Sequence, residues 1–574
     1  MTELGLDLLS TPFSRRGSYL AVSRLAGRGR DGVFLRTVHG DARQRELLRF
    51  QLDGVDVPSA QSTPGRLTLS GGDARLEISF DGGDRATLRL LRGTAVLDVQ
   101  VDAQYDVVLQ EGPAVWRFIA SGAVRNYRIT VDGGDPHLDS GWDGVKDTAA
   151  RLMLTAADGP VTVTVDGFAM TAPQHPPADP DAIAAEAERD YEAWLALHGT
   201  PTADPVIDHA SRLAAYVTWS ALVPAGGVLR RESMLMSKNW MTNVWAWDHC
   251  FNALALWHDP AAAADQLLTL FDHQDAAGGL PDFVNDAGVQ PNFVKPPIHG
   301  WTVGYLLDRG GLAPATAGAL YEPLSRWTHW WFAHRDFGGD GVPSYTHGND
   351  SGWDNSTVFA EGVPLQSPDL LAFLALQMTT LARIADSLGR VGEAVAWRER
   401  ADATVDLMLE RFWTGDRFIA RHTLSQRAIE SESLLTLMPL VLGDQLPPPV
   451  FDRTVRRLLE GGYLTEHGVA TEPVTSPHYV SDGYWRGPVW APTTMLLVDG
   501  LRRGGRSEIA DDLARRFIDT CAAGGMAENF DALTGDGLRD LSMTWTASVY
   551  LALLSSPSPA STAATLGAGG KALA

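Results

Sequence analysis

Carboxyl groups beside large aromatic residues are the first feature that could do chemistry. The sequence SGWDNS at 351–356 places Asp354 directly after Trp353, in an expected turn that contains Gly352. An apolar wall disfavours the charged form of a carboxyl group and so raises its pKa. An acid that keeps its proton near neutral pH can donate it to a leaving group. Asp354 is therefore a candidate general acid, with helix capping as the alternative role.

A second carboxyl group would complete a hydrolytic pair. Hydrolysis of a glycosidic bond needs one carboxyl group that protonates the leaving oxygen and another that activates water or attacks the sugar. We pair Asp354 with Glu528, because both are expected in loops that precede different helices. Other carboxylates could compete for these roles: Asp248, Glu361, Glu432, Glu472 and Asp482.

Tryptophan is unusually frequent and often lies beside Asp, Gly, Arg or Lys. The chain has 18 Trp but 12 Tyr. Indole faces can stack on sugar rings while charged neighbours bind hydroxyl groups, although Trp also fills helix interfaces. Asp248 in particular could accept hydrogen bonds from two hydroxyls if it is ionised. The candidate substrate-binding residues are Trp247, Asp248, Lys295, Trp353, Trp485, Arg486 and Trp490.

Other chemistries fit the sequence less well. His249, His299 and His347 could serve as the acid and base of a sugar isomerase or epimerase, and a carbohydrate-binding protein without turnover is a further alternative. The two cysteines, Cys250 and Cys521, form no CxxC, which disfavours a thiolate zinc site. No GxSxG nucleophile motif occurs. We expect neither a metal nor a cofactor.

Two regions of different periodicity must position these residues. Residues 1–172 alternate apolar and polar positions between Gly-rich turns, which predicts an antiparallel β-sandwich. The tetrapeptide SGWD recurs there at 140–143, where we expect a loop. Residues 173–200 predict a Pro-rich linker and a connecting helix.

The region 201–556 predicts about a dozen helices in a ring, with function on one face where the long loops gather. A flexible tail, 557–574, follows. The expected helices are 206–222, 245–258, 261–274, 298–308, 317–335, 369–388, 390–413, 428–442, 450–460, 485–502, 506–520 and 540–555.

The overall charge limits the classes of partner that the protein can bind. A formal net charge of −23 disfavours nucleic acid and anionic membranes, which need basic patches. Residues 1–16 lack the apolar core of a secretion signal, and no apolar run approaches the roughly 20 residues that cross a bilayer. We therefore expect a cytoplasmic protein whose partner is a small carbohydrate. The oligomeric state stays open.

The ordered set of motifs resembles glycoside hydrolase family 63. These motifs are WD at 247–248, KPP at 295–297, SGWDNS at 351–356, YWRGPVW at 484–490 and ENFD at 528–531. The resemblance implies an (α/α)6 barrel and an inverting mechanism. It places Asp354 at the general acid, Glu528 at the general base, and Asp248 with the 484–490 segment at the non-reducing sugar. The N-terminal sandwich resembles the accessory domain of larger family members.

The resemblance also orders the possible activities. Asn355 follows the acid as in family 63, where the related family 37 trehalases usually have Phe, so trehalose is the weaker substrate. The first expectation is an exo-acting inverting α-glucosidase that releases glucose from a short oligosaccharide or a small glucoside. The alternative is a glucosylglycerate or mannosylglycerate hydrolase, or a trehalase.

Overall fold

The computed structural model describes residues 4–27, 30–40, 45–199 and 203–555. The chain divides into two compact units. The first contains the N-terminal part up to Leu197 together with Ala215–Val244 and Asn285–Gly288, and the second contains the other described residues. The predicted flexible tail, 557–574, lies outside the described residues. The predicted boundaries at 172 and 200 stay predictions.

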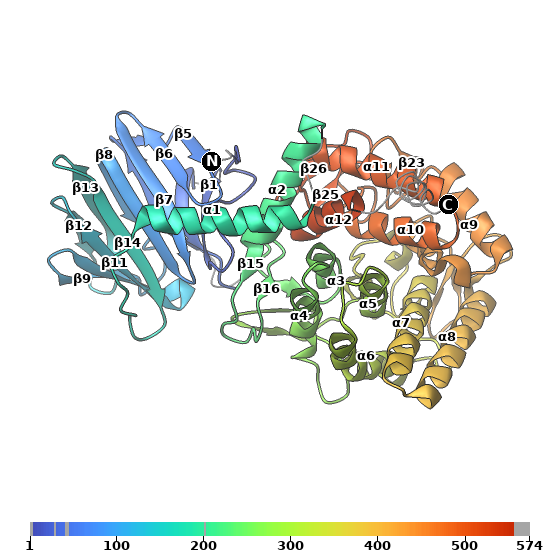
Figure 1. Cartoon of the computed structure of the whole chain (residues 1–574). Helices are drawn as coiled ribbons and strands as arrows, with labels where there is room; N and C mark the ends of the chain where they lie inside the picture. The colour runs from blue at the N-terminus through green and yellow to red at the C-terminus, as the bar shows by residue number, and fades with distance from the viewer. Residues whose placement is uncertain (1–3, 28–29, 41–44, 200–202, 556–574) are drawn as a thin grey trace, which may run out of the picture. The chain divides into compact units, whose positions relative to one another are not determined.

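The first unit is built on antiparallel strands, shown in blue to blue-green in Figure 1. One layer contains β1 (Leu20–Leu25), β2 (Gly32–Thr37), β3 (Arg45–Leu52), β13 (Asp147–Ala156) and β12 (His137–Trp142). The other contains β5 (Ser59–Ser62), β6 (Leu67–Gly71), β7 (Ala74–Gly82), β14 (Val161–Phe168), β11 (Arg125–Asp132), β10 (Val115–Ala120) and β9 (Val107–Gly112). The short β4 (Val55–Asp56) extends the first layer beside β3.

The long strand β8 (Arg85–Val99) belongs to both layers. Its first half pairs with β7 and β14, and its second half pairs with β3 and β13. The change occurs at Gly93, whose φ of +79° favours glycine and whose Cβ would lie 2.6 Å from Ala74. Leu88, Leu90 and Leu97 of this strand are fully buried, so the core lies along it. The predicted sandwich is thus confirmed.

The second copy of SGWD lies in a strand rather than in a loop. Ser140–Trp142 ends β12 and pairs with β13, and the turn begins at Asp143, whose carboxylate accepts from Val145 N at 2.9 Å. The loop prediction was therefore wrong, because the strand pairing extends over Gly141. Trp142 is 58% exposed, unlike Trp353. After the sheet, α1 (Pro180–Leu197) packs on β7 and β8, and its Ile183 and Tyr191 are buried.

The second unit is a ring of inner and outer helices that alternate along the chain, green to red in Figure 1. The inner elements contact one another in a closed circuit: α3 (Asp248–Asn252) with η2 (Ala253–Leu256), α5 (His299–Asp308), α7 (Pro368–Ser387), η5 (Leu434–Gln445), α10 (Ala491–Arg503) and α12 (Thr544–Leu554). The outer helices are α4 (Pro260–Phe271), α6 (Pro314–His334), α8 (Val391–Phe412), α9 (Pro448–Glu460) and α11 (Ser507–Gly524). This circuit is the predicted (α/α)6 barrel. Helix α2 (Pro205–Ala221) divides between the two units after Ala214.

The alternation has a geometric consequence for the loops. Because each outer helix returns the chain, the inner helices run in the same direction and their N-termini share one end of the ring. The segments that lead into them are long and carry small sheets, such as β17 (Val244–Trp245) with β18 (Phe283–Asn285) and β19 (Gly288–Gln290). The connections at the opposite end are short turns such as 388–390 and 504–506. The segments at 247–248, 351–356, 484–490 and 528–531 each lead into a different inner helix.

Two predicted helices differ from the structure. The expected helix 485–502 begins only at Ala491, because Pro492 occupies the first turn and the preceding Val489 pairs with Phe530 as an isolated bridge. The expected helix 428–442 instead contains β22 (Ala428–Ile429), paired with β21 (Ala420–His422), followed by the 3-10 element η5. Both differences leave residues near the site in loops.

Helix α7 is central to the ring. Among the described helices it alone is long and apolar enough to cross a membrane, but 78% of its apolar window is buried inside the structure. It contacts α5, α6, α8 and η5, which accounts for its apolar composition.

Candidate active site

The loop that carries Asp354 is held by close backbone packing. A short 3-10 turn, η3 (Gly348–Ser351), ends at Gly352, whose φ is +76°. A Cβ on Gly352 would lie 2.5 Å from the indole of Trp247, and one on Gly348 would lie 2.1 Å from the carbonyl oxygen of Asp354. Only glycine fits at either position without displacement. The two glycines thus fix the half-buried Asp354 beside the Trp247 segment.

Asp350 anchors the same loop. Its carboxylate accepts hydrogen bonds from Thr346 N at 2.8 Å, from Thr346 Oγ1 at 2.6 Å and from Arg335 Nη1 at 2.9 Å. Asp350 is fully buried, so these charge-assisted bonds fix the start of the turn. Asp350 is therefore structural, although its residue type and position resemble those of a catalytic carboxyl.

Asn355 joins the Asp354 loop to the segment before α10. Its Nδ2 donates to Gly483 O at 3.0 Å, and its Oδ1 accepts from Trp485 N at 2.9 Å. That segment is in turn joined to the Glu528 strand β25 (Asn529–Phe530), since Val489 and Phe530 exchange backbone hydrogen bonds at 2.8 and 3.0 Å. The structure therefore brings together the loops of Trp247, Asp354, Trp485 and Glu528.

Glu528 is buried and carries a perturbed carboxyl group. Its side chain lies among Asp540, Arg539 and Tyr484, and its backbone N donates to Asp540 O at 2.6 Å. Burial, reinforced by the charge of Asp540, raises the pKa of Glu528 to about 7. Arg539 and a hydrogen bond from Tyr484 act in the opposite direction. A carboxyl group with this pKa can exchange a proton near neutral pH.

Asp248 and Asp354 share one cation. Lys295 Nζ lies 3.2 Å from Asp282 Oδ1 and donates to Asn349 O at 3.0 Å, and its charge also acts on Asp248 and Asp354. Burial raises the pKa of Asp354, and raises that of Asp248 to about 8 despite the Lys295 charge. Asp248 therefore holds its proton at neutral pH, whereas the sequence argument assumed an ionised carboxylate. A protonated carboxyl group can donate one hydrogen bond as well as accept.

Tyr484 is the residue that sequence reasoning did not select. Hydrogen bonding by its hydroxyl lowers the pKa of Glu528, and burial followed by the charges of Glu528, Asp354 and Asp248 raises the pKa of Tyr484. The charges of all three carboxyl groups thus act on one phenol, in agreement with the hydrogen bonds that join their loops. Its φ of +64° is a left-handed conformation that costs about 1–2 kcal/mol for a side-chain-bearing residue. Such strain is typical of functional sites.

The predicted aromatic residues form one cluster of indoles. Trp485 stacks on Trp490 with ring centroids 3.9 Å apart and an angle of 7°, and it also contacts Trp353 at 4.8 Å and Trp247 at 5.9 Å. Trp545, not selected from the sequence, contacts both Trp247 and Trp490 edge-on. Trp490 has no exposed surface, and Trp353 and Trp485 are each only 1% exposed, so the indoles pack mainly against one another. Direct sugar contact by these indoles stays a prediction.

Several polar atoms of the cluster lack protein partners. Within the described residues, Asp248 Oδ2 and Trp485 Nε1 are buried without a hydrogen bond. Arg486, in the same segment, is half-buried and forms no side-chain hydrogen bond or ion pair to any described residue. Buried polar groups normally find partners, so these atoms are suited to receive those of a polar ligand.

The competing carboxylates have other partners. Glu361 pairs with Arg427, Glu432 with Arg457, and Asp482 with Arg539, and these carboxylate side chains are 44–61% exposed. The buried Glu472 accepts from Thr357 Oγ1 at 2.8 Å and from Ser476 Oγ at 2.7 Å. The three carboxylates whose charges raise the pKa of Tyr484 most are Glu528, Asp354 and Asp248, and none of these four competitors.

The histidines do not form an acid–base pair. Burial lowers the pKa of His299 to about 3, so it stays neutral. His347 Nδ1 accepts from Asn349 N at 3.0 Å and caps the η3 turn. His249 is fully buried in α3. Among the described residues, no group of three or more His, Cys, Asp or Glu has the arrangement of a metal site.

A helical ring with raised-pKa carboxyl groups at the N-terminal end of its inner helices fits the class of barrel glycoside hydrolases. The chain belongs to the family of the mannosylglycerate hydrolase MGH1-like glycoside hydrolase domain, which matches residues 241–546, more than half of the chain. It is thus a glycoside hydrolase of family 63, as the motifs predicted.

Similar proteins match about half of the chain. A mannosylglycerate hydrolase of Rubrobacter radiotolerans is 24% identical over 400 residues, which cover 54% of this chain and 89% of that protein. A glucosylglycerate hydrolase of Mycolicibacterium hassiacum is 24% identical over 412 residues, which cover 54% of this chain and 91% of that protein.

Two solved structures share the fold at low sequence identity. The family 63 mannosylglycerate hydrolase of Thermus thermophilus superposes with a TM-score of 0.52 at 19% identity, over 61% of this chain and all of that chain. A bacterial glucoamylase complexed with acarbose superposes with a TM-score of 0.60 at 12% identity, over 96% of this chain and 93% of that chain. These structures support the fold and not the substrate.

Proposed function

We propose that this glycoside hydrolase cleaves the α-glycoside of a small hydroxy acid, mannosylglycerate or glucosylglycerate, with inversion at the anomeric carbon. The names of the similar proteins support this substrate class over the first expectation from the sequence, an α-glucosidase acting on a short oligosaccharide. The observation that carries the catalytic assignment is that the loops of Asp354 and Glu528 are joined to the same segment, through the Asn355 bond to Trp485 N and the Val489–Phe530 backbone bonds.

Asp354 acts as the general acid in this proposal. Burial raises its pKa, which favours the protonated form that can transfer its proton to the glycosidic oxygen as the bond to the anomeric carbon breaks. Lys295 limits that rise, because its ammonium favours the carboxylate that remains after proton transfer. Burial and the Lys295 charge thus act on the pKa of Asp354 in opposite directions.

Glu528 acts as the general base. Its pKa of about 7 leaves an ionised fraction that can take a proton from water while the oxygen attacks the anomeric carbon from the opposite face. The Tyr484 hydroxyl favours the carboxylate form of this base, because its hydrogen bonding lowers the pKa of Glu528. The product then has the anomeric configuration opposite to that of the substrate.

The substrate contacts follow from the groups that remain. Asp248 can both donate to and accept from sugar hydroxyls. Trp353 and Trp485 are only 1% exposed, so in this proposal they brace the loops of the site through their mutual contact. Arg486 has no carboxylate partner among the described residues, so its guanidinium can bind the carboxylate of the hydroxy acid. In a chain with a net charge of −23, an anionic substrate requires such a local cation.

A hydrolysis panel tests the proposal. Purified protein is incubated with mannosylglycerate, glucosylglycerate, maltose and trehalose, and the released anomer is followed by NMR. We expect turnover of a glycosylglycerate with initial release of the β-anomer. Initial release of the α-anomer would contradict inversion, and faster turnover of maltose would contradict the hydroxy-acid substrate.

Two substitutions test the catalytic pair. Asp354→Asn and Glu528→Gln should each reduce kcat on the order of 10²–10⁴-fold, the usual contribution of general acid or base catalysis. Asp416→Asn is the control, because Asp416 is 73% exposed and pairs only with Arg453 among the described residues. Near-wild-type turnover by either catalytic variant, with an unchanged melting temperature, would remove that residue from the mechanism.

A further inference from the structure

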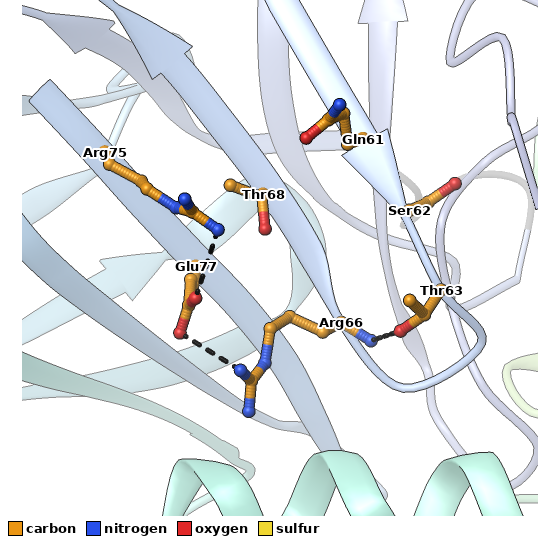
Figure 2. Close-up of a pocket in the computed structure, with 7 residues that line it drawn as sticks. All are labelled: Gln61, Ser62, Thr63, Arg66, Thr68, Arg75 and Glu77. Carbon is orange, nitrogen blue, oxygen red and sulfur yellow. Dashed lines mark hydrogen bonds and ion pairs between the residues drawn. The ribbon is translucent and has the colours of Figure 1, made fainter. Parts of the chain in front are cut away.

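The face of the N-terminal sheet carries a polar pocket, in the first of the two compact units. It has a cavity volume of about 280 Å³ and is shown in Figure 2. Ligand pockets for small molecules begin near ~300 Å³, so this volume suits a molecule of roughly monosaccharide size. Its lining contains hydroxyl, amide, guanidinium and carboxylate groups but no aromatic side chain.

The strand register explains why these side chains gather. Gln61 on β5 lies opposite Thr68 on β6, and Thr68 lies opposite Glu77 on β7. Residues directly opposite each other in an antiparallel sheet point to the same face. Arg75, two positions before Glu77, is on that face as well, while Leu67, Leu69 and Leu76 point to the buried core.

The edge of the pocket is held in place. The turn between β5 and β6 contacts helix α1, because a Cβ on Gly65 would lie 2.1 Å from the Ala184 carbonyl oxygen. Thr63 Oγ1 donates to Glu188 at 2.7 Å, and Arg66 pairs with Asp181 of the same helix at 2.5 Å. The wall is thus preorganised, which lowers the cost of binding.

The charges leave one cation available. Glu77 is buried and is bound by Arg89 at 2.7 Å, with Arg66 at 3.5 Å and Arg75 at 3.9 Å. Arg66 is also neutralised by Asp181 from outside the lining. Arg75 has only the distant Glu77 as an ionic partner among the described residues, and its side chain is 45% exposed. Its guanidinium can therefore bind an anion.

Two neutral groups beside that cation also lack partners. Neither the Gln61 amide nor the Thr68 hydroxyl forms a side-chain hydrogen bond to a described residue. Both residues are cross-strand neighbours in the series Gln61, Thr68, Glu77. An amide and a hydroxyl can each donate and accept, which is what sugar hydroxyls require. The lining thus combines one anion-binding group with groups that bind hydroxyls.

We infer that this pocket binds a compact polyhydroxylated anion, either a sugar acid or a sugar phosphate. The carboxylate or phosphate pairs with Arg75, and the hydroxyls bind Gln61 and Thr68. Glu77 keeps the neighbouring guanidinium groups in position and excludes a ligand with a second anionic group at that side. The site lies in the unit that does not contain Asp354 and Glu528, so it does not rest on the proposed activity.

Calorimetry on the full chain tests this site with four probes: gluconate, glucose 6-phosphate, glucose and inorganic phosphate. Hydrogen-exchange protection of peptides within residues 59–82 locates the binding, which separates it from binding in the helical unit. We expect gluconate or glucose 6-phosphate to protect these peptides, and their comparison distinguishes the two sources of the anion. Glucose and inorganic phosphate should each bind about tenfold more weakly or worse, since each lacks one half of the recognised chemistry.

Arg75→Gln should weaken this binding about tenfold or more, since it removes a charge-assisted hydrogen bond. Arg151→Gln is the matched control, because Arg151 is an exposed sheet arginine with a single distant partner, Asp98 at 3.7 Å. Equal binding by the Arg75 variant and the wild type would overturn the inference. So would protection confined to the helical unit, or inorganic phosphate binding as tightly as both sugar anions.

Discussion

Removal of the Tyr484 hydroxyl tests whether the phenol controls the ionisation of Glu528. In Tyr484→Phe the hydrogen bond to the carboxyl group is lost, while the ring and its contact with Trp490 at 5.0 Å can be kept. That hydrogen bond favours the carboxylate and therefore lowers the pKa of Glu528. Its loss should raise the pKa.

The size of the effect follows from the hydrogen bond and the starting pKa. A hydrogen bond to a charged group contributes ~1.5–3 kcal/mol, and ~1.4 kcal/mol corresponds to one pKa unit. The pKa of Glu528, about 7 in the wild type, should thus become about 8 or more. At pH 7 the ionised fraction falls from about one half to about one tenth, so kcat/KM should fall about fivefold.

The assay is the pH profile of kcat/KM, whose acidic limb reports the base in the free enzyme. We expect this limb to move up by about one pH unit, with activity recovered at pH 9 relative to the wild type at the same pH. Tyr463→Phe is the control, because Tyr463 is also buried and its hydroxyl donates only to the Glu432 carbonyl, at 2.7 Å. A loss of equal size at every pH, with the limb unmoved, would refute the reasoning.

Three further substitutions test how the site is held. Gly352→Ala should lower stability by about 1–3 kcal/mol and kcat by about tenfold, because a Cβ would collide with the Trp247 indole. Gly362→Ala is the control for backbone strain alone, since Gly362 has a φ of +103° and no atom within 4 Å of its Cβ position. Equal melting temperatures of the two variants would exclude the collision. Asn355→Ala loses two hydrogen bonds to the segment before α10. It should lower kcat about fivefold with little change in melting temperature, and an unchanged kcat would show that these two bonds are dispensable. Lys295→Met removes the charge that lowers the pKa of Asp354, so the alkaline limb of the pH profile should move to higher pH, and a limb that moves to lower pH would contradict the assigned acid.

The sequence was sufficient for the fold class and for the two carboxyl groups that we propose as the catalytic pair. Burial of one face of a strand or helix places apolar residues at regular intervals along the chain. The interval of two in the first 172 residues and the helical interval after residue 200 could therefore be read from the sequence. Asp354 and Glu528 could be selected because each lies in a loop that leads into a helix. The two loops lie at the same end of the ring because inner and outer helices alternate. The predicted number of helices, about a dozen, already indicated such a ring.

The sequence was insufficient where distant segments decide a local conformation. Nothing near Tyr484 indicates its left-handed backbone, which is maintained by Asn355 across the ring and by Arg539, whose guanidinium lies 4.8 Å from the ring centroid. The protonated state of Asp248 likewise depends on burial by other loops. The late start of α10 was readable from Pro492, a residue typical of a first helical turn.

The unequal loop lengths at the two ends of the ring affect how the enzyme can diversify. The short turns, such as 388–390 and 504–506, set the spacing of neighbouring helices, so an insertion there would shift helices that pack throughout the core. The long segments before the inner helices can gain or lose residues while the helix contacts stay the same. New acceptor groups can therefore evolve by loop exchange at one end, and a circular permutation that opens the chain at 389 should leave every loop of the catalytic cluster uncut.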